Sequence, residues 1–501
     1  MSKLLVTISP PTPNGDLHIG HLAGPFLSAD VYTRAQRQRG HEAILVSYSD
    51  DYQSYMLRKG VELDADPMEL ANSYTDKICE TLKIMDIDID NWLRPYENPF
   101  FKDAVTEVYN AATAADLIIN KPSLEPYCSG CDRWGYEAFG RGDCNYCGVD
   151  SDASQCEGCG QEPIAKEMKN FHCKLCGEAH EWVEVKRDFL LLEKCEETLR
   201  TLYSRKVIRL PLKSWIKYTL TNYLKEWGVT RPGDGGLDLA SDGSRRIHTW
   251  FMGLSGYLAA LKEYAHEANT PELYDDILKS SDSRFIHFMG FDCALSHNII
   301  YPSLLSSIPE YEIKQLFYPN QFLKLNGLNL STSRNHVIWG RDIATNYESD
   351  PVRLYLASIS PEETESDFVM DVFNVWHDDV YAKFSENLFK LSSSESTEFL
   401  GQLKKDDYEV ISGLRKRWLS ATSVDQFSMC DLAQITLDTM AQIEQRLVRK
   451  VPAKYLIELL SVFCKPITPK LADRICSFFK IDEDEVTKYL INGLNEAEYS
   501  I

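Results

Sequence analysis

Two histidines three residues apart form the first feature of this sequence that could do chemistry. His18 and His21 stand in the run Pro-Thr-Pro-Asn-Gly-Asp-Leu-His-Ile-Gly-His, which begins at Pro11. An apolar run over residues 4–8 precedes it and a helical pattern follows, so we expect a strand-to-helix turn. Backbone N–H groups and the positive end of a helix dipole attract anions at such a turn. Because Gly20 adds no side chain between the rings, the turn is predicted to hold the phosphates of a nucleoside triphosphate.

Cysteines form the second feature. Eight of the fourteen form four Cys-x-x-Cys pairs within 49 residues. Each pair can turn two thiolates toward one ion, and tetrahedral zinc takes two such pairs. Spacing alone leaves the pairing open, although the short gap between Cys147 and Cys156 favours joining the inner pairs. We predict two structural zinc ions, since disulfides would require an oxidising compartment. The ligands are Cys128, Cys131, Cys144, Cys147, Cys156, Cys159, Cys173 and Cys176.

The His-Ile-Gly-His run resembles the signature of class I aminoacyl-tRNA synthetases, and residues 11–15, Pro-x-Pro-Asn-Gly, are most similar to the methionyl branch. The resemblance implies an α/β fold, with a Rossmann-type catalytic domain, an inserted connective domain with zinc knuckles and an all-α helical bundle. It implies nested zinc pairing, in which the outer cysteine pairs meet across the insertion. It also implies ATP with Mg²⁺, an amino acid and tRNA as reactants.

A later loop departs from the family in its charge. Residues 327–334 align with the Lys-Met-Ser-Lys-Ser loop, whose lysines neutralise the leaving pyrophosphate, but Asn329 and Thr332 stand in place of both lysines. Losing one such donor typically slows chemistry about a hundredfold or more. Hydroxyl groups and one arginine remain to contact the phosphates. The catalytic candidates are His18, Gly20, His21, Ser331, Thr332, Ser333 and Arg334.

The resemblance also assigns residues to the amino-acid pocket. Asp51 would lie near the α-ammonium group, Arg231 near the activated carboxylate, and an aromatic pair beside the substrate side chain. The complete set is Pro10, Pro11, Asp51, Arg231, Trp250, Tyr257, Asp292 and His297. Met252, Gly253 and Leu254 replace the family's Asp, Ala and Pro, so we expect methionine or a related amino acid as substrate.

Four of these pocket residues also have a purely structural explanation. Asp51 could cap the helix that follows it. Arg231 could be a surface arginine. Trp250 and Tyr257 could belong to the core.

Several elements must position these residues. Strands are expected over residues 4–8 and 43–47, the second of which delivers Asp50 and Asp51 to its carboxyl end, where ligands bind in open α/β sheets. A helix over 19–39 should kink at Gly24 and Pro25. Helical patterns cover 67–85, 100–115 and 188–227, and a turn is expected over 86–98.

The domain division follows from these elements. Residues 1–117 and 227–349 form the two halves of the catalytic domain, 118–226 the insertion, and 350–501 the bundle. By resemblance the bundle reads the anticodon. Asn387 fits that pattern, but Leu391 replaces an arginine and no tryptophan follows residues 465–470. Because RNA recognition uses arginine and aromatic platforms, the case for tRNA is weaker.

Composition narrows the possible environments. The net charge of −22 argues against general attraction to nucleic acid or an anionic membrane, though it allows a local basic groove. No apolar run reaches the roughly 18 residues of a membrane span, so a cytoplasmic protein is expected; nothing indicates an oligomeric state. Three functions remain: an ATP-dependent aminoacyl-adenylate-forming ligase that charges tRNA, a tRNA-independent ligase that acylates a small molecule, and a non-catalytic binding module.

Overall fold

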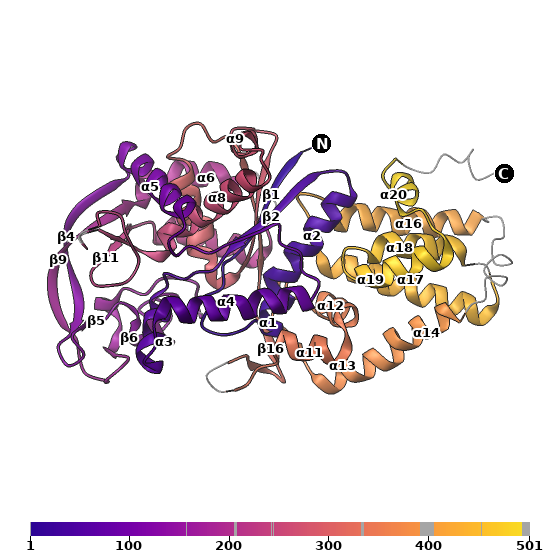
Figure 1. Ribbon diagram of the computed structural model, residues 1–501, viewed down its shortest axis with the longest axis horizontal. Helices are drawn as coiled ribbons and strands as arrows, with labels where there is room; N and C mark the ends of the chain where they lie inside the picture. Colours follow the sequence, from indigo (N-terminus) through magenta and orange to yellow (C-terminus); the bar gives the residue numbers. More distant parts are fainter. Residues whose placement is uncertain are drawn as a thin grey trace.

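The computed structural model describes residues 2–156, 158–204, 208–241, 243, 245–331, 335–390, 405–451 and 453–492. A five-stranded parallel sheet of order β15-β14-β1-β2-β3 forms its centre (Figure 1). The strands are β1 (Lys3–Ile8), β2 (Glu42–Tyr48), β3 (Asn91–Leu93), β14 (Arg284–Gly290) and β15 (Lys314–Asn320). From β1 the chain adds β2 and β3 on one side of β1, and it later adds β14 and β15 on the other side. The direction in which strands are added therefore reverses between β1 and β14. Ligands bind at this switch point in open α/β sheets.

Helices on both faces of the sheet bury its apolar strands. The predicted kink is confirmed: α1 (Ile19–His21) passes through the π-turn η1 (Leu22–Phe26) into α2 (Leu27–Gln38), and Gly24 has φ −90° and ψ −120°. Further helices are α3 (Ser54–Leu63), α4 (Pro67–Ile84), α5 (Pro99–Ala114), α8 (Thr249–Glu267), α9 (Glu272–Leu278) and α10 (Tyr301–Leu305). The expected turn over 86–98 contains β3, whose three residues are too few to show a period.

The insertion is built on a long antiparallel ribbon of β4 (Ile118–Cys128) and β9 (Glu181–Leu191), at the end of the molecule opposite the C-terminal helices in Figure 1. Between them lie β5 (Arg133–Trp134), β6 (Glu137–Asp143), β7 (Asp150–Ala153) and β8 (Lys169–Cys173). The helix expected over 188–227 was wrong at both ends, because Asp188 to Leu190 pair with β4, and Glu226 and Trp227 pair with β9. Helices α6 (Glu196–Ser204) and α7 (Leu210–Asn222) then lead to β10 (Glu226–Gly228), β11 (Thr230–Arg231), β12 (Leu237–Asp238) and β13 (Arg246–Ile247).

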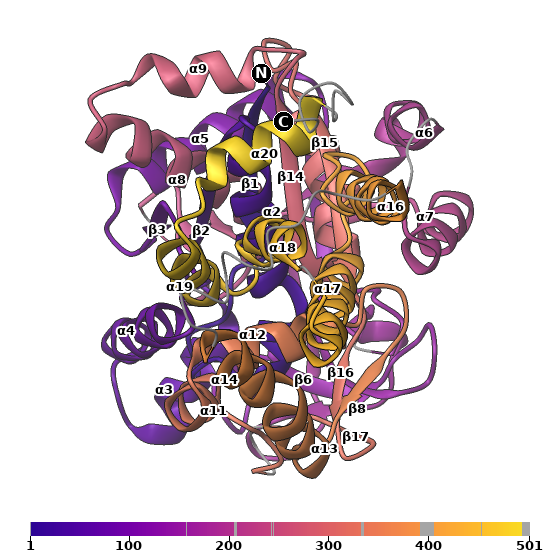
Figure 2. The same ribbon diagram turned by 90° about the vertical axis from the view of Figure 1, so that its right-hand side faces the viewer.

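The C-terminal region forms the expected helical bundle, which Figure 2 shows nearest the viewer. It comprises α11 (Gly340–Tyr347), α12 (Ser349–Ser358), α13 (Met370–Trp376), α14 (Lys383–Phe389), α16 (Lys405–Ala421), α17 (Met429–Arg449), α18 (Lys454–Cys464), α19 (Pro469–Phe479) and α20 (Glu483–Asn492). One short strand, β18 (Ser366–Phe368), was not expected there; it pairs with β16 (Leu323–Leu325).

A buried ion pair joins the bundle to the nucleotide-binding half. The guanidinium of Arg353 on α12 lies 2.6 Å from the carboxylate of Asp30 on α2, and both side chains are almost fully buried. One hydrophobic core runs continuously through the sheet's helices and the bundle. Across the described ranges, every helix is too short or too polar to cross a membrane.

Candidate active site

The turn after β1 fixes the proton positions on both signature histidines. The backbone N–H of Gly20 donates to Nδ1 of His18 (3.1 Å), and that of His18 donates to Nδ1 of His21 (3.2 Å). The rings stack with centroids 3.8 Å apart. Burial lowers the pKa of His21 to about 4, and burial followed by the charge of His21 lowers the pKa of His18 well below its usual value. Both imidazoles are therefore neutral near pH 7 and carry their proton on Nε2, as two hydrogen-bond donors.

The segment around the lysine-free loop packs against this turn. The N–H of Ile19 donates to the carbonyl of Ile338 (3.0 Å), next to the β-bridge between His18 and Trp339. A Cβ on Gly20 would lie 2.6 Å from Cδ1 of Leu330, so the side chain of Leu330 packs directly over the glycine. The histidine turn and the loop therefore lie side by side.

The loop is closed by two backbone hydrogen bonds. They join Ser331 and His336 in both directions, at 2.9 and 3.0 Å. Strand β17 (Leu328–Asn329) precedes the bridge and pairs with β16. The candidates Thr332, Ser333 and Arg334 lie outside the described residues.

Two carboxylates follow β2 at the same edge of the sheet. The N–H of Asp50 donates to the carbonyl of Pro11 (3.0 Å), which ties the end of β2 to the signature segment that also includes Pro10. Asp50 accepts hydrogen bonds from Thr249 (2.5 Å) and Gln53 (2.7 Å). Asp51 is only 2% exposed, and its Oδ1 has no hydrogen-bond partner in the described part of the chain. Burial, with a smaller contribution from Asp50, raises its pKa to about 7.

The capping explanation for Asp51 was wrong. Helix α3 begins at Ser54, and Gln53 occupies the N-cap position. A buried carboxylate oxygen with no donor is costly unless a cation or donor arrives with a ligand. Asp51 is therefore the group at this edge of the sheet most suited to an ammonium ion.

Arg231 is held inside the protein by carboxylates that the sequence did not single out. Its guanidinium lies 2.7 Å from Glu162 and 3.3 Å from Glu137, and its side chain is 8% exposed. Nε2 of His248 lies 2.6 Å from Glu137. Burial raises the pKa of Glu137, but His248 and Arg231 outweigh it and hold that pKa at about 2. The surface explanation for Arg231 was wrong, and no motif marks Glu137 or Glu162 in the sequence.

The predicted aromatic wall is buried beside these groups. Trp250 lies in the first turn of α8, where Thr249 also contacts Asp50. The hydroxyl of Tyr257 lies 2.9 Å from Nε2 of His297, on the π-turn η5 (Ser296–Ile300), and burial lowers the pKa of His297 to about 3. Asp292, in η4 (Phe291–Cys293), is half-buried. The structure thus brings Tyr257 and His297 into contact, and packs Trp250 and Tyr257 into one core.

The eight paired cysteines gather into two clusters in the nested arrangement. Cys128, Cys131, Cys173 and Cys176 form the outer cluster, and Cys144, Cys147, Cys156 and Cys159 form the inner one. Sulfur–sulfur distances across the pairs are 3.5 to 3.9 Å, too long for disulfides. A tetrahedron with metal–sulfur bonds of about 2.3 Å has edges of about 3.8 Å, so both clusters fit a tetrahedral ion such as zinc.

The sequence and the fold are similar to those of known methionine–tRNA ligases. Methionine–tRNA ligase of Thermoplasma acidophilum is 29% identical over 399 residues, covering 78% of this chain and 72% of that protein. The Thermoplasma volcanium enzyme of the same name is 30% identical over 373 residues, covering 74% and 68%. The fold resembles Mycobacterium tuberculosis methionyl-tRNA synthetase in complex with methionyl-adenylate, with a TM-score of 0.75, 15% identity, and coverage of 98% of this chain and 96% of that one.

These similarities extend over most of the chain. Residues 4–389 match the profile of the family described as tRNA synthetases class I (M), which spans both sheet halves, the insertion and the first bundle helices. The predicted Rossmann-type fold with an inserted cysteine-rich domain and a following helical bundle is thereby confirmed. The chain belongs to the class I tRNA synthetases of the (M) family.

Proposed function

We propose that this protein activates an amino acid with ATP to an aminoacyl-adenylate and transfers the aminoacyl group to tRNA, with methionine as the first candidate substrate. The observation that carries the proposal is the pairing of two features at one sheet edge. The turn after β1 offers the Nε2–H donors of His18 and His21, and the end of β2 offers the unpartnered carboxylate oxygen of Asp51. These features suit a phosphate chain and an ammonium group. The relatives named methionine–tRNA ligase support the choice of amino acid.

In the first step a carboxylate oxygen of the amino acid attacks the α-phosphorus of ATP. The new oxygen–phosphorus bond forms as the bond to the bridging oxygen breaks, and pyrophosphate leaves with that electron pair. His18 and His21 would donate to the phosphates, while ionised Asp51 would hold the ammonium group. In the second step a ribose hydroxyl of tRNA would displace AMP from the acyl carbon and lose its proton.

The loop residues that the structure describes supply no positive charge to this site. The described part of the loop offers the hydroxyl of Ser331 and the amide of Asn329, and neither carries a charge. Arg231 is already neutralised by two carboxylates. We therefore propose that ATP enters as its Mg²⁺ complex, whose ion offsets part of the phosphate charge.

We also propose that both cysteine clusters hold zinc. Four thiolates complete a tetrahedral shell, so no position is left open for a substrate and the ions would stabilise the insertion. The insertion corresponds to residues 118–226 in the proposed domain division, flanked by the catalytic halves 1–117 and 227–349 and followed by the bundle, 350–501.

Pyrophosphate exchange into ATP, measured with each of the twenty amino acids, tests activation. Methionine-dependent exchange is the expected result, and silence with every amino acid would leave only a binding role. Charging of total tRNA with the active amino acid then tests the second step. Pyrophosphate exchange without charging of tRNA would indicate that the acceptor of the acyl group is a small molecule.

A further inference from the structure

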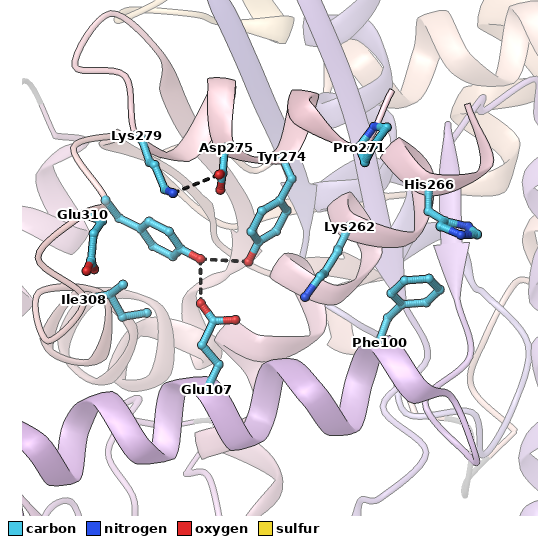
Figure 3. Close-up of a pocket in the computed structure, with 11 residues that line it drawn as sticks. Phe100, Glu107, Lys262, His266, Pro271, Tyr274, Asp275, Lys279, Ile308 and Glu310 are labelled. Carbon is cyan, nitrogen blue, oxygen red and sulfur yellow. Dashed lines mark hydrogen bonds and ion pairs between the residues drawn. The ribbon is translucent and has the colours of Figure 1, made fainter. Parts of the chain in front are cut away.

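A cavity that opens to the surface lies at the opposite edge of the parallel sheet from the candidate active site. It has a volume of about 530 Å³ and is lined by residues of α5, α8, α9 and 308–311 (Figure 3). Helix α9 packs beside the start of β1, where Nζ of Lys3 lies 2.9 Å from Asp276. His18 and Asp51 follow the other ends of β1 and β2. The cavity is therefore separate from the candidate active site.

A directed chain of hydroxyl groups points at one carboxylate in this cavity. Tyr311 donates to Oε1 of Glu107 at 2.8 Å, so it accepts from the hydroxyl of Tyr274, 3.0 Å away. The second carboxylate oxygen of Glu107, Oε2, accepts no hydrogen bond from any residue that the structure describes. Figure 3 shows both oxygens of Glu107 projecting from α5 toward the cavity.

An ammonium group on α8 extends into the same cavity. Lys262 is half-buried, has no carboxylate partner in the described ranges, and stands 5.8 Å from the ring centroid of Tyr274. The other lysine at the rim, Lys279, is paired with Asp275 at 2.9 Å. Glu107 and Lys262 thus present opposite charges to the cavity from facing helices without forming an ion pair.

Apart from Glu310 at the rim, the remaining wall is mostly apolar and aromatic. The rings of Phe100 and His266 lie together with centroids 5.4 Å apart, and Ile308 is buried on the opposite side. Figure 3 shows the two rings beyond Lys262, on the side away from Glu310. A side chain without charge could pack there, next to the two charged groups.

We propose that this cavity binds a free α-amino acid as its zwitterion. The ligand carboxylate would accept from Lys262, its ammonium group would donate to Oε2 of Glu107, and its side chain would pack against Phe100 and His266. A phosphate would meet the charges of Glu107 and Glu310, and a simple amine would meet Lys262. Only a ligand with both charges satisfies both groups, and the volume lies within the range of small-molecule sites.

Equilibrium dialysis with each of the twenty amino acids tests the site in a chain that carries Asp51→Asn, which removes the proposed ammonium partner of the candidate active site. At least one amino acid with an apolar or aromatic side chain should bind with a Kd of about 1 mM or tighter. Adding Lys262→Met or Glu107→Gln should weaken that binding about tenfold or more, because each removes a charge-assisted hydrogen bond. Lys279→Met is the matched control, and it should leave the Kd unchanged.

Two ligand analogues make the test specific to a zwitterion. For the best amino acid, the amine that lacks the carboxylate and the acid that lacks the ammonium group should each bind about tenfold more weakly. Binding of either analogue as tightly as the amino acid would overturn the proposal. Equal affinity in the Lys262→Met chain, or no binding by any of the twenty, would overturn it as well.

Discussion

Replacing Asp51 with asparagine should make the free protein more stable and the amino-acid complex weaker. The carboxylate is 2% exposed, and one of its oxygens has no partner in the structure as described. Burial raises its pKa from the reference value of 3.8 to about 7. A shift of one unit corresponds to about 1.36 kcal/mol, so about three units correspond to about 4 kcal/mol of cost for holding the charged form in the folded protein. An asparagine side chain at this position would carry no charge and would avoid that cost.

The stability gained by Asp51→Asn should increase as the pH rises. The folded pKa lies above the unfolded pKa, so folding binds a proton between about pH 4 and pH 7. The cost of the carboxylate is absent below about pH 4 and complete above about pH 7. Asp51→Asn should therefore stabilise the protein more at pH 8 than at pH 5. Water entry and relaxation make about 4 kcal/mol a ceiling, and about 2 kcal/mol is expected.

Thermal unfolding in the absence of ligand measures this gain. Unfolding entropy of about 2.1 cal/mol/K per residue gives roughly 1 °C per kcal/mol for this chain, so Tm should rise by about 2 °C at pH 8. Asp66→Asn is the matched control, because Asp66 is exposed, caps α4, and asparagine caps equally well. An Asp51→Asn chain that is less stable than the wild type at pH 8, or equally improved at pH 5 and pH 8, would refute the reasoning.

Asp51→Asn should weaken the binding of the amino acid, although it stabilises the free protein. An ammonium group paired with ionised Asp51 makes a charge-assisted hydrogen bond, and its loss should weaken amino-acid binding about 10- to 100-fold. Wild-type affinity should rise from pH 6 to pH 8 as Asp51 ionises, and the Asp51→Asn chain should lose that rise. A variant with a generally damaged fold would lose both stability and affinity, whereas loss of the ammonium contact alone would lower the affinity of a protein whose Tm has risen. Calorimetric titration together with Tm therefore distinguishes a damaged fold from a lost contact.

Three further predictions concern the phosphates and the cysteine clusters. Asn329→Lys combined with Thr332→Lys should speed pyrophosphate exchange at least about tenfold by restoring positive charge at the leaving group; an unchanged rate would mean that the loop does not contact ATP. His21→Asn should lower kcat for exchange about a hundredfold, while His21→Gln, whose amide nitrogen can replace Nε2, should retain more activity; equal losses would argue against a donor at that position. Metal analysis should find two zinc ions per chain, one of which is lost in Cys156→Ser and neither in the control Cys195→Ser; a single ion in the wild type would contradict the nested clusters.

The fold could be predicted from sequence where the signal is local. The apolar runs at residues 4–8 and 43–47, the Gly-Pro kink and the helical periods indicated β1 and β2, the kinked helix and the bundle, whereas β3, β14 and β15 were not predicted. The end of β9 could not be predicted, because Asp188 to Leu190 take their strand form from pairing with β4, about seventy residues earlier. The same holds for β18, which takes its strand form from pairing with β16, about forty residues earlier in the chain.

For the candidate site, the order of amino acids was enough to establish which groups are present: two histidines around a glycine, a loop without lysines, and eight cysteines in pairs. The state of those groups was set by the folded arrangement. Folding brought the cysteine pairs together in two clusters, surrounded Arg231 with Glu137 and Glu162, and buried Asp51 with one carboxylate oxygen unpaired among the described residues. The physical reason is that residue type and short spacing follow from the chain itself, whereas desolvation and charge pairing depend on neighbours that are distant in sequence.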